Sequence, residues 1–143
     1  MTETSRYTDD IEVRSRGPAT ALRVTSALSV LAILWQGATA GGILMQSRES
    51  FELHEAGAIG VHVLSGLAAV TAFLVWRATR GPRWPMVVAV LVFAASFVQA
   101  ALGDEETMWA HVPGALVLML GGAAVLVWAV VPQRIAYRGK AGQ

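Results

Sequence analysis

Residues 24–45 read VTSALSVLAILWQGATAGGILM and contain no Asp, Glu, Lys or Arg. Three more runs without these charged residues follow, at residues 56–76, 84–103 and 107–131. Each run is long enough for the helix of about 20 residues that crosses the roughly 30 Å hydrocarbon core of a membrane. Because a segment in lipid must satisfy its backbone hydrogen bonds internally, we expect helices and not strands. Since the connections are short, the sequence predicts an all-α fold, a membrane-embedded up-down-up-down four-helix bundle.

The composition excludes several classes of protein. Of the 143 residues, 55% are hydrophobic and 15% are charged, whereas a soluble domain has about 45–50% apolar and about 25% charged residues. The mean hydropathy of +0.52 argues against a cytosolic enzyme and against a disordered chain. The absence of cysteine excludes disulfides, zinc–thiolate sites, iron–sulfur clusters and thiol nucleophiles. A net charge of +1 gives no indication of nucleic-acid binding.

The chain divides into three segments. Residues 1–20 carry charges of both signs, and we expect them to form a flexible cytoplasmic tail. Residues 21–132 form the predicted four-helix transmembrane domain, whose last helix ends at a proline. Residues 133–143 are again polar, and we expect them to form a cytoplasmic C-terminal tail.

The distribution of charge predicts the orientation in the membrane. Ten of the eleven Lys and Arg residues lie on the N-terminal side of the first span, in the loop of residues 77–83 or after the last span. The other two loops contain only Arg48 among basic residues, together with six acidic residues. Because Lys and Arg accumulate in short cytoplasmic loops, we expect a multi-pass protein of the cell membrane with both termini cytoplasmic and an acidic outer face.

Two histidines lie inside the predicted spans, where ionisable side chains are costly and mark candidate functional sites. His62 lies seven residues beyond Glu55 in the second span, and His111 lies five residues beyond Glu106 in the fourth. Both imidazoles are therefore expected at a similar depth, roughly 8–10 Å below the acidic face. The second and fourth helices are diagonal partners in such a bundle, so the rings can face each other across its core. Two neutral imidazoles in this arrangement are typical metal ligands of a b-type haem (heme b).

Small and polar residues near these histidines are compatible with a flat cofactor. Gly66 and Gly114 would leave room for a macrocycle, while Gln36 and Gln99 could donate to a haem propionate or bond the second nitrogen of a histidine. Other interpretations remain open, because glycine-rich faces also pack helices and glutamine side chains also link them. Likewise, a histidine near the interface can bond a backbone carbonyl or a lipid headgroup. We expect His54 to be a solvated loop residue, and the alternatives are a third metal or haem contact or a proton relay.

A weak internal repeat relates the two helix pairs. Gln36 is followed by an acidic loop and His62, and Gln99 is followed by an acidic loop and His111. Duplication of a two-helix unit would place these residues symmetrically about an axis along the membrane normal. Chance similarity of a few residues is the alternative.

The same segments resemble one four-helix half of the heme A synthase family. The similar residues are QGATAGG at 36–42, VHVLSG at 61–66, and VQAALG at 98–103 followed by His111. That family has eight spans in two halves, each with a histidine pair on its second and fourth helices, so the resemblance implies His62 and His111 as axial haem ligands. Val63 stands where the family commonly has Arg, and Ile59 stands where it has a Glu of the synthase reaction. The resemblance therefore implies haem binding more than oxidation of a haem methyl group.

Three functions follow from these observations. The first is a membrane protein that binds a b-type haem near its outer face, for electron transfer or haem handling. The second is a non-catalytic structural or accessory subunit that packs through Gly- and Ala-rich helix faces. The third is a haem-modifying enzyme that acts as a homodimer of half-synthases. The expected partners are the lipid bilayer and either another membrane protein or a second copy of the chain.

Overall fold

The computed structural model describes the backbone of residues 3–131 and the side chains from Ser15 onward. Within this part of the chain the structure is entirely helical, as predicted. Its elements are α1 (Glu3–Leu44), α2 (Arg48–Thr79), α3 (Trp84–Ala101), the short 3₁₀ helix η1 (Glu105–Thr107) and α4 (Met108–Val130). The predicted C-terminal tail, residues 133–143, lies outside the described residues.

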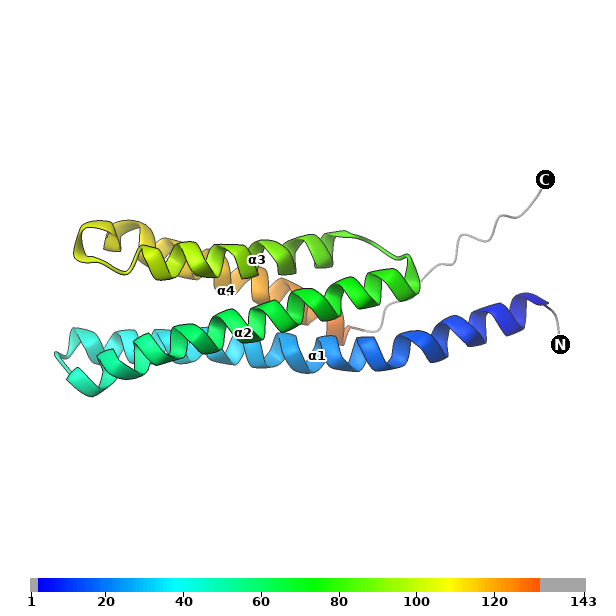
Figure 1. The fold of residues 1–143 in the computed structure, drawn as a ribbon, viewed down its shortest axis with the longest axis horizontal. Coiled ribbons are helices and arrows are strands. Elements are labelled where there is room, and N and C mark those ends of the chain that lie inside the picture. The colour runs from blue at the N-terminus through cyan, green and yellow to red at the C-terminus, as the bar shows by residue number, and fades with distance from the viewer. Residues whose placement is uncertain (1–2, 132–143) are drawn as a thin grey trace.

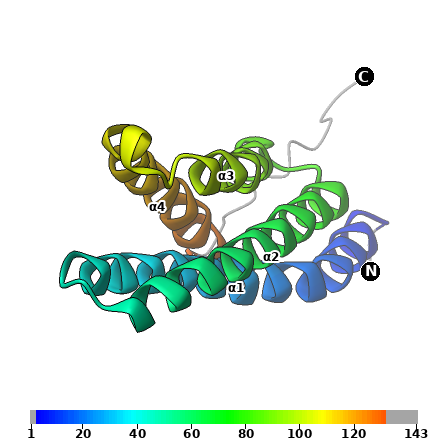
Figure 2. The ribbon, with the colours of Figure 1, turned by 60° about the vertical axis from the view of Figure 1, so that its left-hand side comes forward.

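The four α-helices run up, down, up and down, which confirms the predicted topology. Helices α1 and α2 form one layer and α3 and α4 form the other (Figures 1 and 2). Each helix packs against its neighbours in sequence, and α4 returns to α1, so that α1 and α3 are diagonal, as are α2 and α4. The described start of α1, the α2–α3 connection and the end of α4 share one end of the bundle (Figure 1).

All four helices are long and apolar enough to cross a membrane, as the uncharged runs predicted. The membrane-capable segments are Ser15–Leu44, Arg48–Thr79, Trp84–Ala101 and Glu105–Val130. Several of them extend beyond the uncharged runs, because helical structure continues into the charged flanks. These properties are those of an integral membrane protein.

The segment expected to form a flexible N-terminal tail is part of a helix in the structure. Helix α1 begins at Glu3 and continues through Pro18 without a break. A proline inside a helix removes one backbone donor and crowds the carbonyl of the preceding turn, which costs about 3 kcal/mol, so the rest of the helix outweighs this cost.

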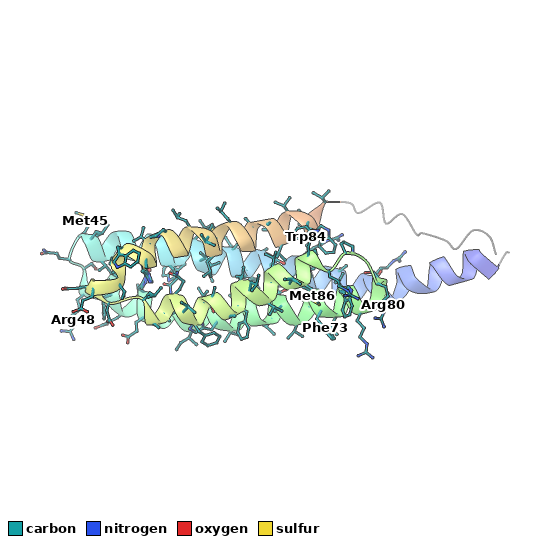
Figure 3. The ribbon with its side chains drawn as sticks, turned by 90° about the horizontal axis from the view of Figure 1, so that it is seen from above. Met45, Arg48, Phe73, Arg80, Trp84 and Met86 are labelled. Carbon is teal, nitrogen blue, oxygen red and sulfur yellow. The ribbon has the colours of Figure 1, made fainter. Side chains whose placement is uncertain are left out.

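The charged residues separate to opposite ends of the bundle. We call the end that carries the acidic residues of the α1–α2 and α3–α4 connections the acidic end, and the opposite end the basic end. Figure 3 shows Met45 and Arg48 at the acidic end and Arg80 and Trp84 at the basic end. The acidic residues are Glu49, Glu52, Glu55, Asp104, Glu105 and Glu106.

Arginines fix the helix ends at the basic end. Arg23 Nε of α1 donates to the carbonyl of Ala129 at 2.9 Å, near the C-terminus of α4. This placement is favourable because the last carbonyls of a helix carry partial negative charge. The guanidinium groups of Arg80 and Arg83 lie 5.4 and 5.3 Å from the ring centre of Trp76. These cation–π contacts hold the α2–α3 connection against the end of α2.

Small residues bring the helices together over the basic half and the middle of the bundle. One buried cluster gathers Ala69, Ala72 and Ala89 around Leu22 and Val125. A second cluster follows in the middle of the bundle, formed by Ile33, Val61, Val92 and Leu118. The small-residue faces that the sequence offered for packing or for a cofactor therefore pack helices within the chain over this half.

The buried core stops before the acidic end. No described residue within 40–60 or within 97–117 is buried, although both ranges belong mostly to helices of the bundle. Close-packed side chains normally fill the interior of a protein domain. The acidic third of the bundle thus differs from the rest, and its interior is where the candidate site lies.

Candidate functional site

Two histidines from diagonal helices meet at the acidic end. His54 of α2 and His111 of α4 have ring centroids 6.3 Å apart and ring planes tilted by 55°. Both rings are partly buried. His111 was predicted as a site residue, whereas His54 was expected to be a solvated loop residue. That expectation is wrong for its position, because α2 begins at Arg48 and includes His54.

The same interaction orients both imidazole rings. His111 Nδ1 lies 2.9 Å from the backbone carbonyl of Gln99 on α3. His54 Nδ1 lies 3.2 Å from the backbone carbonyl of Gln36 on α1 and 2.9 Å from Thr39 Oγ1. A carbonyl oxygen only accepts hydrogen bonds, so the neutral rings carry their proton on Nδ1. The lone pair of each ring is therefore on Nε2, the nitrogen that a metal would take.

The glycine one turn after each histidine completes the repeat. A Cβ atom on Gly57 would lie 3.0 Å from Oε1 of Gln36, and a Cβ atom on Gly114 would collide with the side-chain amide of Gln99. The backbone carbonyl of each glutamine thus accepts a hydrogen bond from a histidine, and the side chain of the same glutamine packs over a glycine of the returning helix. The two helix pairs repeat this arrangement with Gln36, His54 and Gly57 in one and Gln99, His111 and Gly114 in the other.

The internal repeat is therefore present, but it pairs different residues from those expected from the sequence. Gln36 is paired with His54, not with His62, and the equivalent of Gly114 is Gly57. A signal for this register exists in the sequence, since both histidines begin a His-x-x-Gly pattern. We missed it because His54 lies before the uncharged run that defined the second span.

His62 contacts α3 instead of His111. Its Nδ1 lies 2.8 Å from Ser96 Oγ, and its ring stacks on Phe97 with centroids 4.2 Å apart and planes inclined by only 5°. Gly66, expected to leave room for a cofactor, faces the ring of Phe93, since a Cβ atom there would lie 3.1 Å from that ring. The structure thus brings together His111, Gln36, Gln99 and Gly114, and it places His62 and Gly66 at the α2–α3 contact.

The side chain of Gln99 has an unpaired polar atom. Its Oε1 atom is buried and has no hydrogen-bond partner among the described residues. A buried acceptor without a donor is costly, and most such atoms in folded proteins are paired. This atom belongs to the side chain that packs over Gly114, beside His111.

The donor set has the chemistry for two ligands to one metal centre. Two imidazoles that bind one metal at about 2 Å from opposite sides have ring centroids roughly 6 Å apart, close to the observed 6.3 Å. The described residues contain no group of three or more His, Cys, Asp or Glu side chains that could hold a bare metal ion. A haem brings four equatorial nitrogens of its own and takes only two axial ligands from the protein. The residues at this site therefore fit a haem better than a bare metal ion.

Comparisons with protein-family models, curated proteins and solved structures found no match for this chain. The fold alone therefore defines the class of protein. Its described residues form four helices that are long and apolar enough to cross a membrane.

The hydrogen bonds of the site predict an unusual tautomer for two histidines. When their imidazole rings are neutral, His54 and His111 should carry their proton on Nδ1, because each Nδ1 faces a backbone carbonyl. Nitrogen-15 NMR of histidine-labelled protein at alkaline pH distinguishes the two nitrogens, and single His54→Gln and His111→Gln variants assign the signals. Protonation of Nε2 in either ring would contradict the described geometry.

Proposed function

We propose that this protein is an integral membrane protein that binds a b-type haem at its acidic end, where His54 and His111 would hold the iron. The observation that carries the proposal is the meeting of these two rings, 6.3 Å apart, with both Nδ1 atoms engaged by carbonyls. Neutral imidazoles with a free Nε2 lone pair are typical haem ligands.

The surroundings of the rings support this assignment. Thr39, whose hydroxyl lies 2.9 Å from His54 Nδ1, is the last buried residue of α1 toward the acidic end, and both imidazole rings are only half-buried. The carbonyls of Gln36 and Gln99 set the orientation of the rings, as partners behind metal ligands usually do.

A bound haem supplies one-electron redox chemistry, so electron transfer or haem handling is the role we propose. The synthase-like alternative has less support. Ile59, at the position of the acidic residue in the resembled family, is apolar and 66% exposed on the outer surface of α2. It offers no group for proton transfer to a substrate.

We further propose that the acidic end lies at the outer, non-cytoplasmic side of the cell membrane and that both termini are cytoplasmic. The support is the charge asymmetry, because the described start of α1, the end of α4, and the end of α2 with the α2–α3 connection, which carry Arg77, Arg80 and Arg83, share the end of the bundle opposite the acidic residues. A reporter that is active only in the cytoplasm should therefore be active when fused to either terminus and inactive when inserted after Gln46. The reverse pattern would contradict this orientation.

A second candidate function, an accessory subunit, rests on one exposed face of α1. Gly37 and Gly41 lie four residues apart, and nothing within 4 Å would meet a Cβ atom at either position. Small residues at this spacing let another membrane helix approach closely. This function needs neither histidine, so the spectra below separate it from haem binding.

The haem proposal predicts which histidine substitutions remove the cofactor. Purified protein supplied with haem should show a sharp α-band in the reduced-minus-oxidised spectrum. The band should disappear in His54→Ala and in His111→Ala, because each loses one axial ligand, and persist in His62→Ala, whose ring contacts α3. Haem at a hundredfold excess over its Kd should also stabilise the wild-type fold by about 2.7 kcal/mol, which raises its Tm.

The matched variants make the outcomes distinct. Loss of the band in His62→Ala but not in His54→Ala would support the histidine pair expected from sequence. A featureless spectrum from folded wild-type protein, without a haem-dependent rise in Tm, would contradict haem binding and leave the accessory function.

A further inference from the structure

His62 forms a second polar site, between α2 and α3, that the haem proposal does not use. Its Nδ1 lies 2.8 Å from Ser96 Oγ, and the Ser96 hydroxyl donates to the carbonyl of Phe93 at 2.7 Å. A serine hydroxyl has one proton, so the proton shared between His62 and Ser96 comes from Nδ1. In the neutral ring, Nε2 is therefore a hydrogen-bond acceptor, and no described residue donates to it.

The surface around His62 is apolar and aromatic. Phe97 covers one face of the imidazole and is itself 50% exposed, while Phe93 meets Phe97 edge to face at 5.2 Å. On α2, the neighbouring side chains Ile59 and Val63 are 66% and 55% exposed. Exposed residues on a membrane-spanning helix face the lipid, so this acceptor lies at the edge of a lipid-facing aromatic surface.

Depth restricts what can satisfy this acceptor. His62 lies seven residues beyond Glu55, the last charged residue at the acidic end of α2, which corresponds to about 10 Å along the helix axis. Water and charged headgroups are scarce at this depth, and an unpaired polar atom in hydrocarbon is costly. The donor that the site fits is therefore a hydroxyl group carried by a molecule that dissolves in the lipid.

We propose that His62 and Phe97 form a binding site for the aromatic headgroup of a membrane hydroquinone (a quinol). A phenolic hydroxyl of the quinol donates to His62 Nε2, and its ring packs against the exposed face of Phe97. Ser96 and the Phe93 carbonyl hold the imidazole in the accepting tautomer. This inference goes beyond the proposed function and does not depend on haem, because none of these residues belongs to the pair His54 and His111.

The test is equilibrium binding of a radiolabelled short-chain naphthohydroquinone to the full-length protein in nanodiscs, under anaerobic conditions. Empty nanodiscs correct for partition into lipid. The hydroquinone should bind about tenfold more tightly than its dimethyl ether, since the ether has lost the donor. It should also bind more tightly than the oxidised quinone, which can only accept hydrogen bonds.

Variants assign the effect to the residues of the site. His62→Phe keeps an aromatic ring but removes the acceptor, so it should abolish the preference for the hydroquinone over its ether. His62→Gln restores an acceptor and should recover part of that preference. Phe73→Leu is the control, because Phe73 is an exposed ring of the same helix near the basic end, and its affinity should match that of the wild type.

Two results would overturn the inference: equal affinity of the wild type for the hydroquinone and its ether, or an unchanged preference in folded His62→Phe protein. The measurement is made with and without added haem. Failure of haem binding would therefore leave the quinol result readable, and failure of quinol binding would leave the haem spectra unaffected.

Discussion

Two backbone carbonyls, those of Gln36 and Gln99, determine the chemistry of the acidic end. A carbonyl oxygen inside a helix can accept a second hydrogen bond beyond the one from the helix, and here a histidine from the returning helix donates it, together with the Thr39 hydroxyl at Gln36. This bond fixes the ring orientation and places the proton on Nδ1. The same glutamines lay their side chains over Gly57 and Gly114, so that a single residue of each outgoing helix positions two residues of the returning one.

The rest of the fold brings these two units to one place. Alanines and serines at the helix contacts let the two layers pack closely over the basic half, and Arg23 links α1 to the end of α4. Toward the acidic end this packing gives way to the two histidine units. The bundle is therefore held together by close packing over its basic half, while two imidazoles from diagonal helices meet at its acidic end.

The sequence predicted the four helices, their topology and one of the two meeting histidines. Long uncharged runs are strong predictors of membrane-spanning helices, because a segment of that length in lipid must form all its backbone hydrogen bonds internally. They are a poor guide to helix ends, however. Helix α2 starts at Arg48, where Ser47 accepts a hydrogen bond from the backbone N–H of Ser50 and Arg48 pairs with Glu52. The polar first turns therefore belong to the helix and carry His54 with them.

The sequence also did not reveal the direction in which each histidine projects around the axis of α2. His54 and His62 are eight residues apart, which corresponds to about 12 Å along the helix and about 80° around it. One residue consequently reaches α1 and α4 while the other reaches α3. Hydropathy does not determine this angle, because all faces of these spans are apolar. The spacing of His-x-x-Gly after a glutamine in both helix pairs did contain the information, but only the contacts reveal that the two patterns are equivalent.

The most direct test of the central claim, that His54 and His111 meet, uses the absence of cysteine from the chain. Cysteines are introduced in place of His54 and His111, or in place of His62 and His111, and membranes are treated with a short bifunctional thiol reagent. After denaturation, trypsin cuts at Arg77, Arg80 and Arg83, which separates α2 from α4 unless the two are cross-linked. We expect joined fragments for the 54/111 pair and separate fragments for the 62/111 pair. Efficient cross-linking of 62/111 without that of 54/111 would contradict the claim.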